Sequence, residues 1–150
     1  MMVRACLCSL VLTLLTAIGC SDGTPTSPTT TSTTATTTAT AASPAFTEEF
    51  IDTVAVSGSS FYSFTVTQYG TVNISLTSVS GQYVPSTVTM GLGFGKPDAE
   101  TCATTTNIST QAGAGPQLTG AYDPGVYCVK VSDVGNLFSA AKFAVTIAYP

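Results

Sequence analysis

Few side chains in this sequence could carry out catalysis. The chain of 150 residues contains no His and no Trp, and only eight acidic and four basic residues. Without His there is no Ser-His-Asp triad, no Cys-His pair and no His-ligated zinc. The net charge of −4 argues against a nucleic-acid partner, because phosphate binding requires clustered Lys and Arg. We therefore expect a protein that is not an enzyme and has no cofactor.

The carboxylates offer two close pairs. Glu48 and Glu49 are adjacent, so on a strand they point to opposite faces and cannot act together. Asp98 and Glu100 lie two residues apart in the segment 96–100, which is either a cation site, the acid pair of a small hydrolase, or simply a solvated loop. Calcium requires six to eight oxygen ligands, so a calcium site would need three loops to converge. The candidate ligands would be Asp98, Glu100, Asp123 and Asp133.

Three tyrosines lie at expected turns and are candidates for ligand binding. A glycan-binding surface needs an exposed aromatic platform with polar groups beside it. Tyr69, Tyr83 and Tyr122 meet the first requirement by their position in the sequence. The alternative is that they cap the edges of the folded domain.

From Phe46 onward, apolar and polar residues alternate with a period of two. All thirteen aromatic residues lie in this region, which places the start of the folded domain near Phe46. No segment has the apolar spacing of an amphipathic helix, and the Thr, Val, Phe and Tyr content suits half-buried strands. The sequence predicts an all-β domain over 46–150, an antiparallel β-sandwich or jelly-roll-like fold. The alternating segments are 46–56, 62–66, 72–76, 88–94, 118–122, 126–131 and 143–149.

One turn in this region has a specific sequence. Asp123-Pro124-Gly125 separates the segments 118–122 and 126–131. Pro favours the first corner of a turn and Gly accepts a positive φ at the next. This pattern predicts a hairpin that joins the two strands.

Residues 1–19 have the pattern of an export signal. One Arg precedes an apolar run that is shorter than the roughly 20 residues of a membrane span. Residues 15–20, Leu-Thr-Ala-Ile-Gly-Cys, resemble the lipobox of bacterial lipoproteins. The resemblance implies that Cys20 becomes the lipidated first residue and that this lipid anchors the chain in a membrane. The protein would then reside in the bacterial cell envelope, and Ser21 after the cysteine is compatible with sorting to the outer membrane. The alternative is plain secretion after cleavage at the same bond.

A low-complexity segment follows the signal. Residues 21–45 contain eleven Thr, four Ser and three Pro, and no aromatic residue. Such a segment cannot bury enough apolar surface to offset the entropy of ordering it. We expect residues 20–45 to be a disordered tether that begins with the lipidated cysteine. The tether would offer hydroxyls for O-glycosylation and would reach on the order of 75 Å.

Two of the five cysteines remain in the predicted domain. Cys6 and Cys8 leave with the signal, and Cys20 is the expected lipid site. Cys102 and Cys128 are then a pair in an exported domain, which predicts a disulfide. The alternative is two buried free thiols.

The order of these segments resembles bacterial pre-peptidase C-terminal (PPC-like) domains, which are small β-sandwiches carried by secreted proteins. The resemblance implies an accessory, non-catalytic module. We therefore expect an envelope lipoprotein whose β-sandwich contacts an unknown protein or glycan partner; the alternative is a glycan- or calcium-binding module. The matching segments are Ser-Phe-Tyr-Ser-Phe-Thr-Val at 60–66, Gly-Thr-Val-Asn-Ile-Ser-Leu at 70–76, Gly-Val-Tyr-Cys-Val-Lys-Val at 125–131 and Phe-Ala-Val-Thr-Ile at 143–147.

Overall fold

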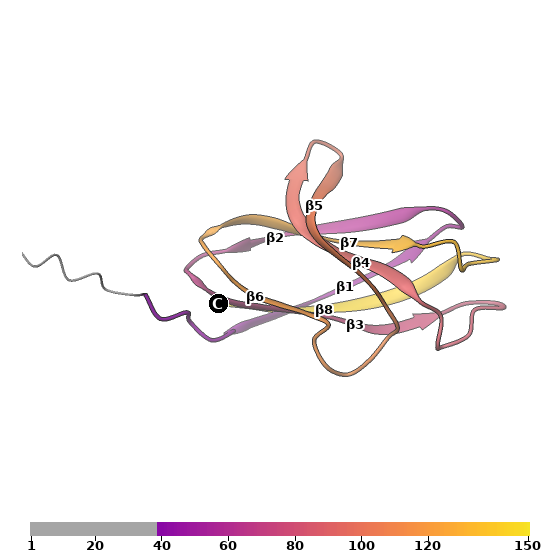
Figure 1. Cartoon of the computed structure of the whole chain (residues 1–150), viewed down its shortest axis with the longest axis horizontal. Helices are drawn as coiled ribbons and strands as arrows, with labels where there is room; N and C mark the ends of the chain where they lie inside the picture. The colour runs from indigo at the N-terminus through magenta and orange to yellow at the C-terminus, as the bar shows by residue number, and fades with distance from the viewer. Residues whose placement is uncertain (1–38) are drawn as a thin grey trace, which may run out of the picture. The chain divides into compact units, whose positions relative to one another are not determined.

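The computed structural model describes residues 39–150, which form two four-stranded antiparallel sheets packed against each other (Figure 1). The predicted all-β sandwich is therefore confirmed. These residues contain no α-helix, and so none long and apolar enough to cross a membrane. The strands are β1 (Phe46–Val54), β2 (Ser59–Val66), β3 (Gly70–Ser80), β4 (Met90–Asp98), β5 (Thr101–Thr110), β6 (Leu118–Tyr122), β7 (Gly125–Asp133) and β8 (Ala141–Tyr149).

The chain passes from one sheet to the other at nearly every connection. The first sheet has the order β1-β8-β3-β6 and the second has the order β2-β7-β4-β5. Only β4 and β5 are consecutive strands of the same sheet. The predicted hairpin at 123–125 is therefore wrong, because β6 pairs with β3 whereas β7 pairs with β2 and β4. The Pro-Gly turn is present but carries the chain across the sandwich.

The core follows from the period-two alternation. In β3, Val72, Ile74 and Leu76 are buried, and the polar residues between them are partly exposed. Val129 and Val131 of β7 are fully buried in the same apolar cluster. Each such side chain stabilises the fold by about 1.5–3 kcal/mol relative to exposure. The core therefore specifies which face of each strand points inward.

Strand β5 is the element that the sequence pattern did not reveal. Its sequence is dominated by Thr, and most of its residues are exposed because it is the edge strand of the second sheet. An edge strand with little burial has no apolar alternation to mark it. The segment 96–100 is consequently the end of a tight β4–β5 hairpin, with Asp98 paired to Thr101.

The ordered domain begins slightly before Phe46. Ala42 donates to the Tyr69 carbonyl at 3.1 Å and accepts from the Thr71 amide at 2.8 Å. Gly70 permits this approach, because a Cβ there would lie 2.5 Å from the Ala42 carbonyl oxygen. The prediction that disorder continues to residue 45 is thus wrong for these last residues. The predicted signal, Cys20 and the tether up to residue 38 lie outside the described residues.

Candidate functional site

Three connections meet at one end of the sandwich and form what we call the loop tip: residues 55–58, 81–89 and 134–140. They join β1 to β2, β3 to β4 and β7 to β8. In Figure 1 these connections lie at the right-hand end, opposite the end at which the described chain begins. None of their residues is charged. The fold therefore gathers a neutral surface at the end farthest from Phe46.

Asp133 holds the loop tip together. Its Oδ2 accepts from the Ser57 amide at 2.8 Å, and its Oδ1 accepts from three successive amides, Gly135 and Asn136 at 2.8 Å and Leu137 at 3.2 Å. These bonds, above all the one from Ser57, outweigh partial burial and lower the pKa of the carboxyl. The Asp133 amide in turn donates to the Gly58 carbonyl at 3.0 Å. One residue therefore fixes two of the three loops.

Further hydrogen bonds attach the loop 81–89. The Asn136 amide group donates to the Thr89 carbonyl at 3.1 Å, and the Ser139 hydroxyl donates to the Gln82 carbonyl. Both donors belong to the loop 134–140, which is therefore bonded directly to the loop 81–89, whereas Asp133 of β7 makes the link to the loop 55–58. The loop tip is a connected surface, and its side chains project from a braced backbone.

The loop tip exposes apolar side chains. Phe138 is 91% exposed and Tyr83 is 80% exposed, and Val56 and Val134 are each about half exposed. These are four of the eight large hydrophobic residues exposed on the described domain. Isolated exposed apolar residues are common, but a neutral cluster at one end of a domain marks a candidate interaction surface.

Tyr83 also has an uncommon backbone conformation. Its φ is +63°, in a turn in which the Val84 amide donates to the Gly81 carbonyl at 3.2 Å. A positive φ at this third turn position is normally taken by Gly or Asn, and a bulky residue there costs on the order of 1 kcal/mol. Strain of this kind concentrates at functional sites, which supports the loop tip as one.

The four candidate calcium ligands are not brought together. Asp98 and Glu100 flank the exposed β4–β5 turn, and Asp123 lies in the turn before β7. Asp133 lies at the far end of β7, on the order of 30 Å from Asp123 along a nine-residue strand. Among residues 39–150 no group of three or more His, Cys, Asp or Glu side chains is placed to hold a metal ion. The role of Asp133 is instead to bind backbone amides.

The three candidate tyrosines occupy different environments. Tyr122 packs on the rings of Phe94 and Tyr127, at centroid distances of 4.5 and 5.6 Å. Tyr69 and Tyr83 flank opposite ends of β3, an eleven-residue strand on the order of 35 Å long. They do not form one platform. Of the three, only Tyr83 belongs to the loop tip.

A second polar cluster joins the two sheets at the other end of the domain. Glu48 of β1 accepts hydrogen bonds from the Tyr62 hydroxyl at 2.8 Å and the Tyr149 hydroxyl at 2.5 Å. The bond to Glu48, with burial, raises the pKa of Tyr149 to about 12 and also raises that of Tyr62. Glu49, the next residue, is exposed. The Glu48 carboxylate therefore connects Tyr149 of its own sheet to Tyr62 of the other sheet, with one hydroxyl at each of its oxygens.

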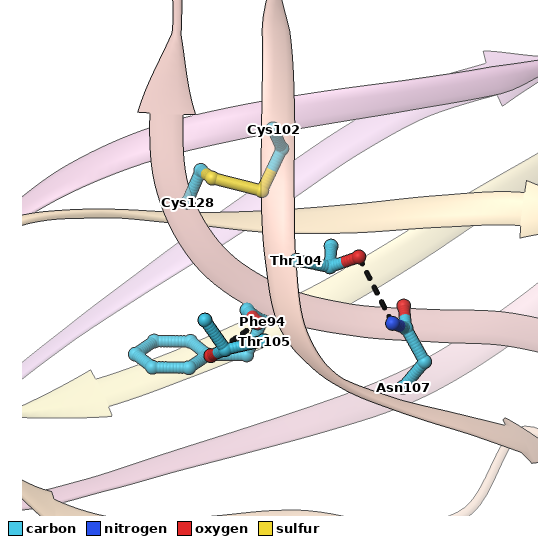
Figure 2. Close-up of a disulfide and its surroundings, with 6 residues drawn as sticks. All are labelled: Phe94, Cys102, Thr104, Thr105, Asn107 and Cys128. Carbon is cyan, nitrogen blue, oxygen red and sulfur yellow. Dashed lines mark hydrogen bonds between the residues drawn. A yellow bond between two sulfur atoms is a disulfide. The ribbon is translucent and has the colours of Figure 1, made fainter.

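The predicted disulfide is confirmed and supports the β4–β5 hairpin. Cys102 of β5 and Cys128 of β7 are bonded, with their Cα atoms 5.8 Å apart, although β4 lies between these strands in the sheet (Figure 2). The hairpin must bend over the sheet to allow this. A bulge between Phe94 and Gly95 provides the bend, and a Cβ on Gly95 would lie 1.9 Å from the Ala103 carbonyl oxygen. In Figure 1 the hairpin rises from the body of the sandwich.

Two loops of the loop tip have a composition that is unusual for connections between strands. Residues 81–89 and 134–140 contain Tyr83 and Phe138 but no charged residue. Long connections are normally polar, so neutral loops with aromatic residues are informative. That the two loops are neighbours follows only from the strand order.

Comparison with known proteins adds no relative. No protein family matches the sequence, and no curated protein matches it either. No pocket is found in the part of the chain that the structure covers. The loop tip and the sequence that precedes the domain are therefore the features that bear on function.

Proposed function

We propose that this protein is a non-catalytic interaction module, exported to the bacterial cell envelope and held there by a lipid on Cys20. The Thr-rich tether spaces the β-sandwich from the anchor, and the loop tip is its binding surface. The observation that carries the proposal is the neutral, apolar loop tip, braced by Asp133, at the opposite end from the residues that follow the tether. This arrangement of the two ends suits a module that is attached at one end and binds its partner at the other.

The anchor is tested by metabolic labelling with an alkyne fatty acid. The wild-type chain should be labelled, and Cys20→Ser should not. Cys8→Ser is the matched control, since Cys8 lies in the predicted signal and its loss should leave the label unchanged. An unlabelled wild-type chain recovered from the culture medium would overturn the anchor.

The binding surface is tested by photo-crosslinking in the native envelope. A benzophenone amino acid replaces Phe138 in one variant and Val126 in another. Val126 is also an apolar residue that is 51% exposed, but it is the second residue of β7 and lies at the end away from the loop tip. We expect adducts from position 138 and none from position 126. Equal adduct yields at both positions, or none at 138, would contradict the proposal.

A further inference from the structure

We propose that the loop tip binds the surface of a phospholipid bilayer that carries no net charge, with Phe138 and Tyr83 inserted among the headgroups and upper acyl chains. The inference rests on the proposed function, since it names what the loop tip binds. Val134 and Val56 would lie behind these two side chains. Three properties of the loop tip support a lipid surface: its charge, its area and its rigidity.

The charge distribution favours a bilayer. Inserting a charged side chain below the headgroups is costly, and the three loops contain none. The nearest carboxylate, Asp133, already accepts four backbone hydrogen bonds and stays at the base of the loops. Tyr is well suited to the interface, because its ring is apolar and its hydroxyl remains hydrated.

The two most exposed apolar side chains would not by themselves form a standard protein interface. Phe138 and Tyr83 are almost fully exposed. Aromatic side chains bury about 150–250 Å² each, so the two together offer on the order of 350 Å². A standard protein interface needs about 800 Å² on each partner. A bilayer needs no complementary partner surface, and a few protruding apolar side chains are enough to partition into it.

The polar groups beside Phe138 argue against a glycan. A sugar must be recognised by hydrogen-bonding groups next to the aromatic ring. Asn136 and Ser139 flank Phe138, but both donate to backbone carbonyls of the neighbouring loop. They brace the loop tip instead of facing a ligand. This bracing lowers the entropy cost of binding, because the loops are ordered beforehand.

The lack of Trp gives a direct assay of insertion. Phe138→Trp places the only Trp of the chain at the loop tip, and Val126→Trp places it at the other end. The full mature proteins are reconstituted in phosphatidylcholine vesicles, with and without brominated lipid. We expect a blue shift and quenching by bromine for Trp at position 138 only. Because the readout is local, it does not depend on the lipid anchor. Absence of quenching at 138 would overturn the inference.

Two double variants of identical composition test the energetics. Phe138→Ser with Val134→Ser alters the loop tip, and Phe46→Ser with Val126→Ser alters exposed residues elsewhere. Each is made in the chain carrying Cys20→Ser, so that sedimentation with vesicles reports the domain alone. The loop-tip variant should bind at least about tenfold more weakly, and the control should bind as the parent does. Equal losses in both would overturn the inference.

Lipid charge and the crosslinking experiment complete the test. The chain has a net charge of −4, so anionic lipid at low salt should weaken binding, and salt should have little effect on neutral vesicles. Binding that requires anionic lipid would contradict the inference.

Crosslinks from position 138 to a protein or glycan, with no lipid adduct, would overturn the lipid inference and leave the proposed function standing. No crosslink at all would overturn both.

Discussion

Replacing Glu48 by Gln removes a charge that two tyrosines share across the sandwich. The Tyr62 and Tyr149 hydroxyls come from β2 and β8, in different sheets, and both donate to Glu48 of β1. The amide of Gln has nearly the same shape as the carboxylate. It accepts hydrogen bonds through one oxygen only and carries no charge. The substitution thus tests the interaction between the sheets without opening a cavity.

The size of the effect follows from the pKa of Tyr149. Its rise from 10.0 to about 12 means that the fold favours the neutral phenol by up to about 2.7 kcal/mol. Part of this rise comes from burial, which the substitution leaves in place. Hydrogen bonds to charged groups contribute about 1.5–3 kcal/mol each when buried, and this cluster is only partly buried. We expect Glu48→Gln to lower the free energy of unfolding by about 1–3 kcal/mol at neutral pH.

The direction of the pH dependence is also specified. Since the folded pKa of Tyr149 lies above that of the unfolded chain, its contribution is fully present below pH 10.0 and is lost as the pH rises towards about 12. Urea unfolding at a series of pH values should therefore show a falling stability over this window. In Glu48→Gln the upper limit of this window should fall, because the carboxylate of Glu48 no longer raises the pKa, whereas burial and Tyr62 still do.

The assay combines urea unfolding with a tyrosinate absorbance titration. The difference between wild-type protein and Tyr149→Phe isolates the Tyr149 transition. Glu49→Gln is the matched control, since it changes the adjacent carboxylate, which is exposed. If both substitutions had the same effect on stability and on the Tyr149 transition, the bridge between the sheets would be refuted and only the net charge would matter.

Four further results are expected. Replacing Cys102 and Cys128 by Ser should lower the free energy of unfolding by about 3 kcal/mol, because the disulfide spans 26 residues; insensitivity of wild-type stability to reductant would contradict this. Asp133→Ala should lower the free energy of unfolding by about 2–4 kcal/mol and speed hydrogen exchange of the four amides that donate to this carboxylate. In wild-type protein the stabilisation by Asp133 should be lost only below pH 3.8, because folding lowers the pKa of its carboxyl. Tyr83→Asn should stabilise the domain by about 0.5–1 kcal/mol in thermal unfolding, because Asn accepts a positive φ, while vesicle binding weakens. Gln117→Ala should lower the free energy of unfolding in urea by about 1–3 kcal/mol, because the Gln117 side chain forms hydrogen bonds with both the amide and the carbonyl of the buried Leu76. An unchanged free energy of unfolding would show that water replaces these two hydrogen bonds.

The sequence was most informative where strands have one buried face. Segments such as 72–76 and 143–149 alternate strictly, and both lie in the centre of the first sheet, where one face packs on the core. The segment 118–122 was also predicted with its observed bounds. By contrast, β5 lies at an edge, and its Thr-rich sequence reflects solvent on most of its surface. The alternation of apolar and polar residues that predicts a strand arises because one face of the strand is buried, so it is absent from strands with little burial.

The pairing of strands was beyond the reach of local patterns. Asp123-Pro124-Gly125 has the residues of a tight turn, and a tight turn is there. Whether it closes a hairpin or passes to the other sheet depends on which edge the next strand can reach, and that is set by contacts distant in sequence. The candidate calcium ligands failed to converge for the same reason. By comparison, the disulfide was predictable because the signal pattern predicts export and the two cysteines of the domain leave one pairing.

The sheet order accounts for the position of the loop tip. Because six of the seven connections cross between the sheets, each end of the sandwich collects loops from strands that are distant in sequence. The described chain begins at one end, where Ala42 and Ala45 form hydrogen bonds with the domain. The loops 81–89 and 134–140 must then lie at the other end, since β3 and β7 both run away from the entry point. Asp133, as the last residue of β7, is placed where its carboxylate can reach the amides of two loops. An insertion or deletion of one residue in β7 would also turn Val129 and Val131 away from the core, so it should abolish hydrogen-exchange protection throughout the domain and not at the loop tip alone.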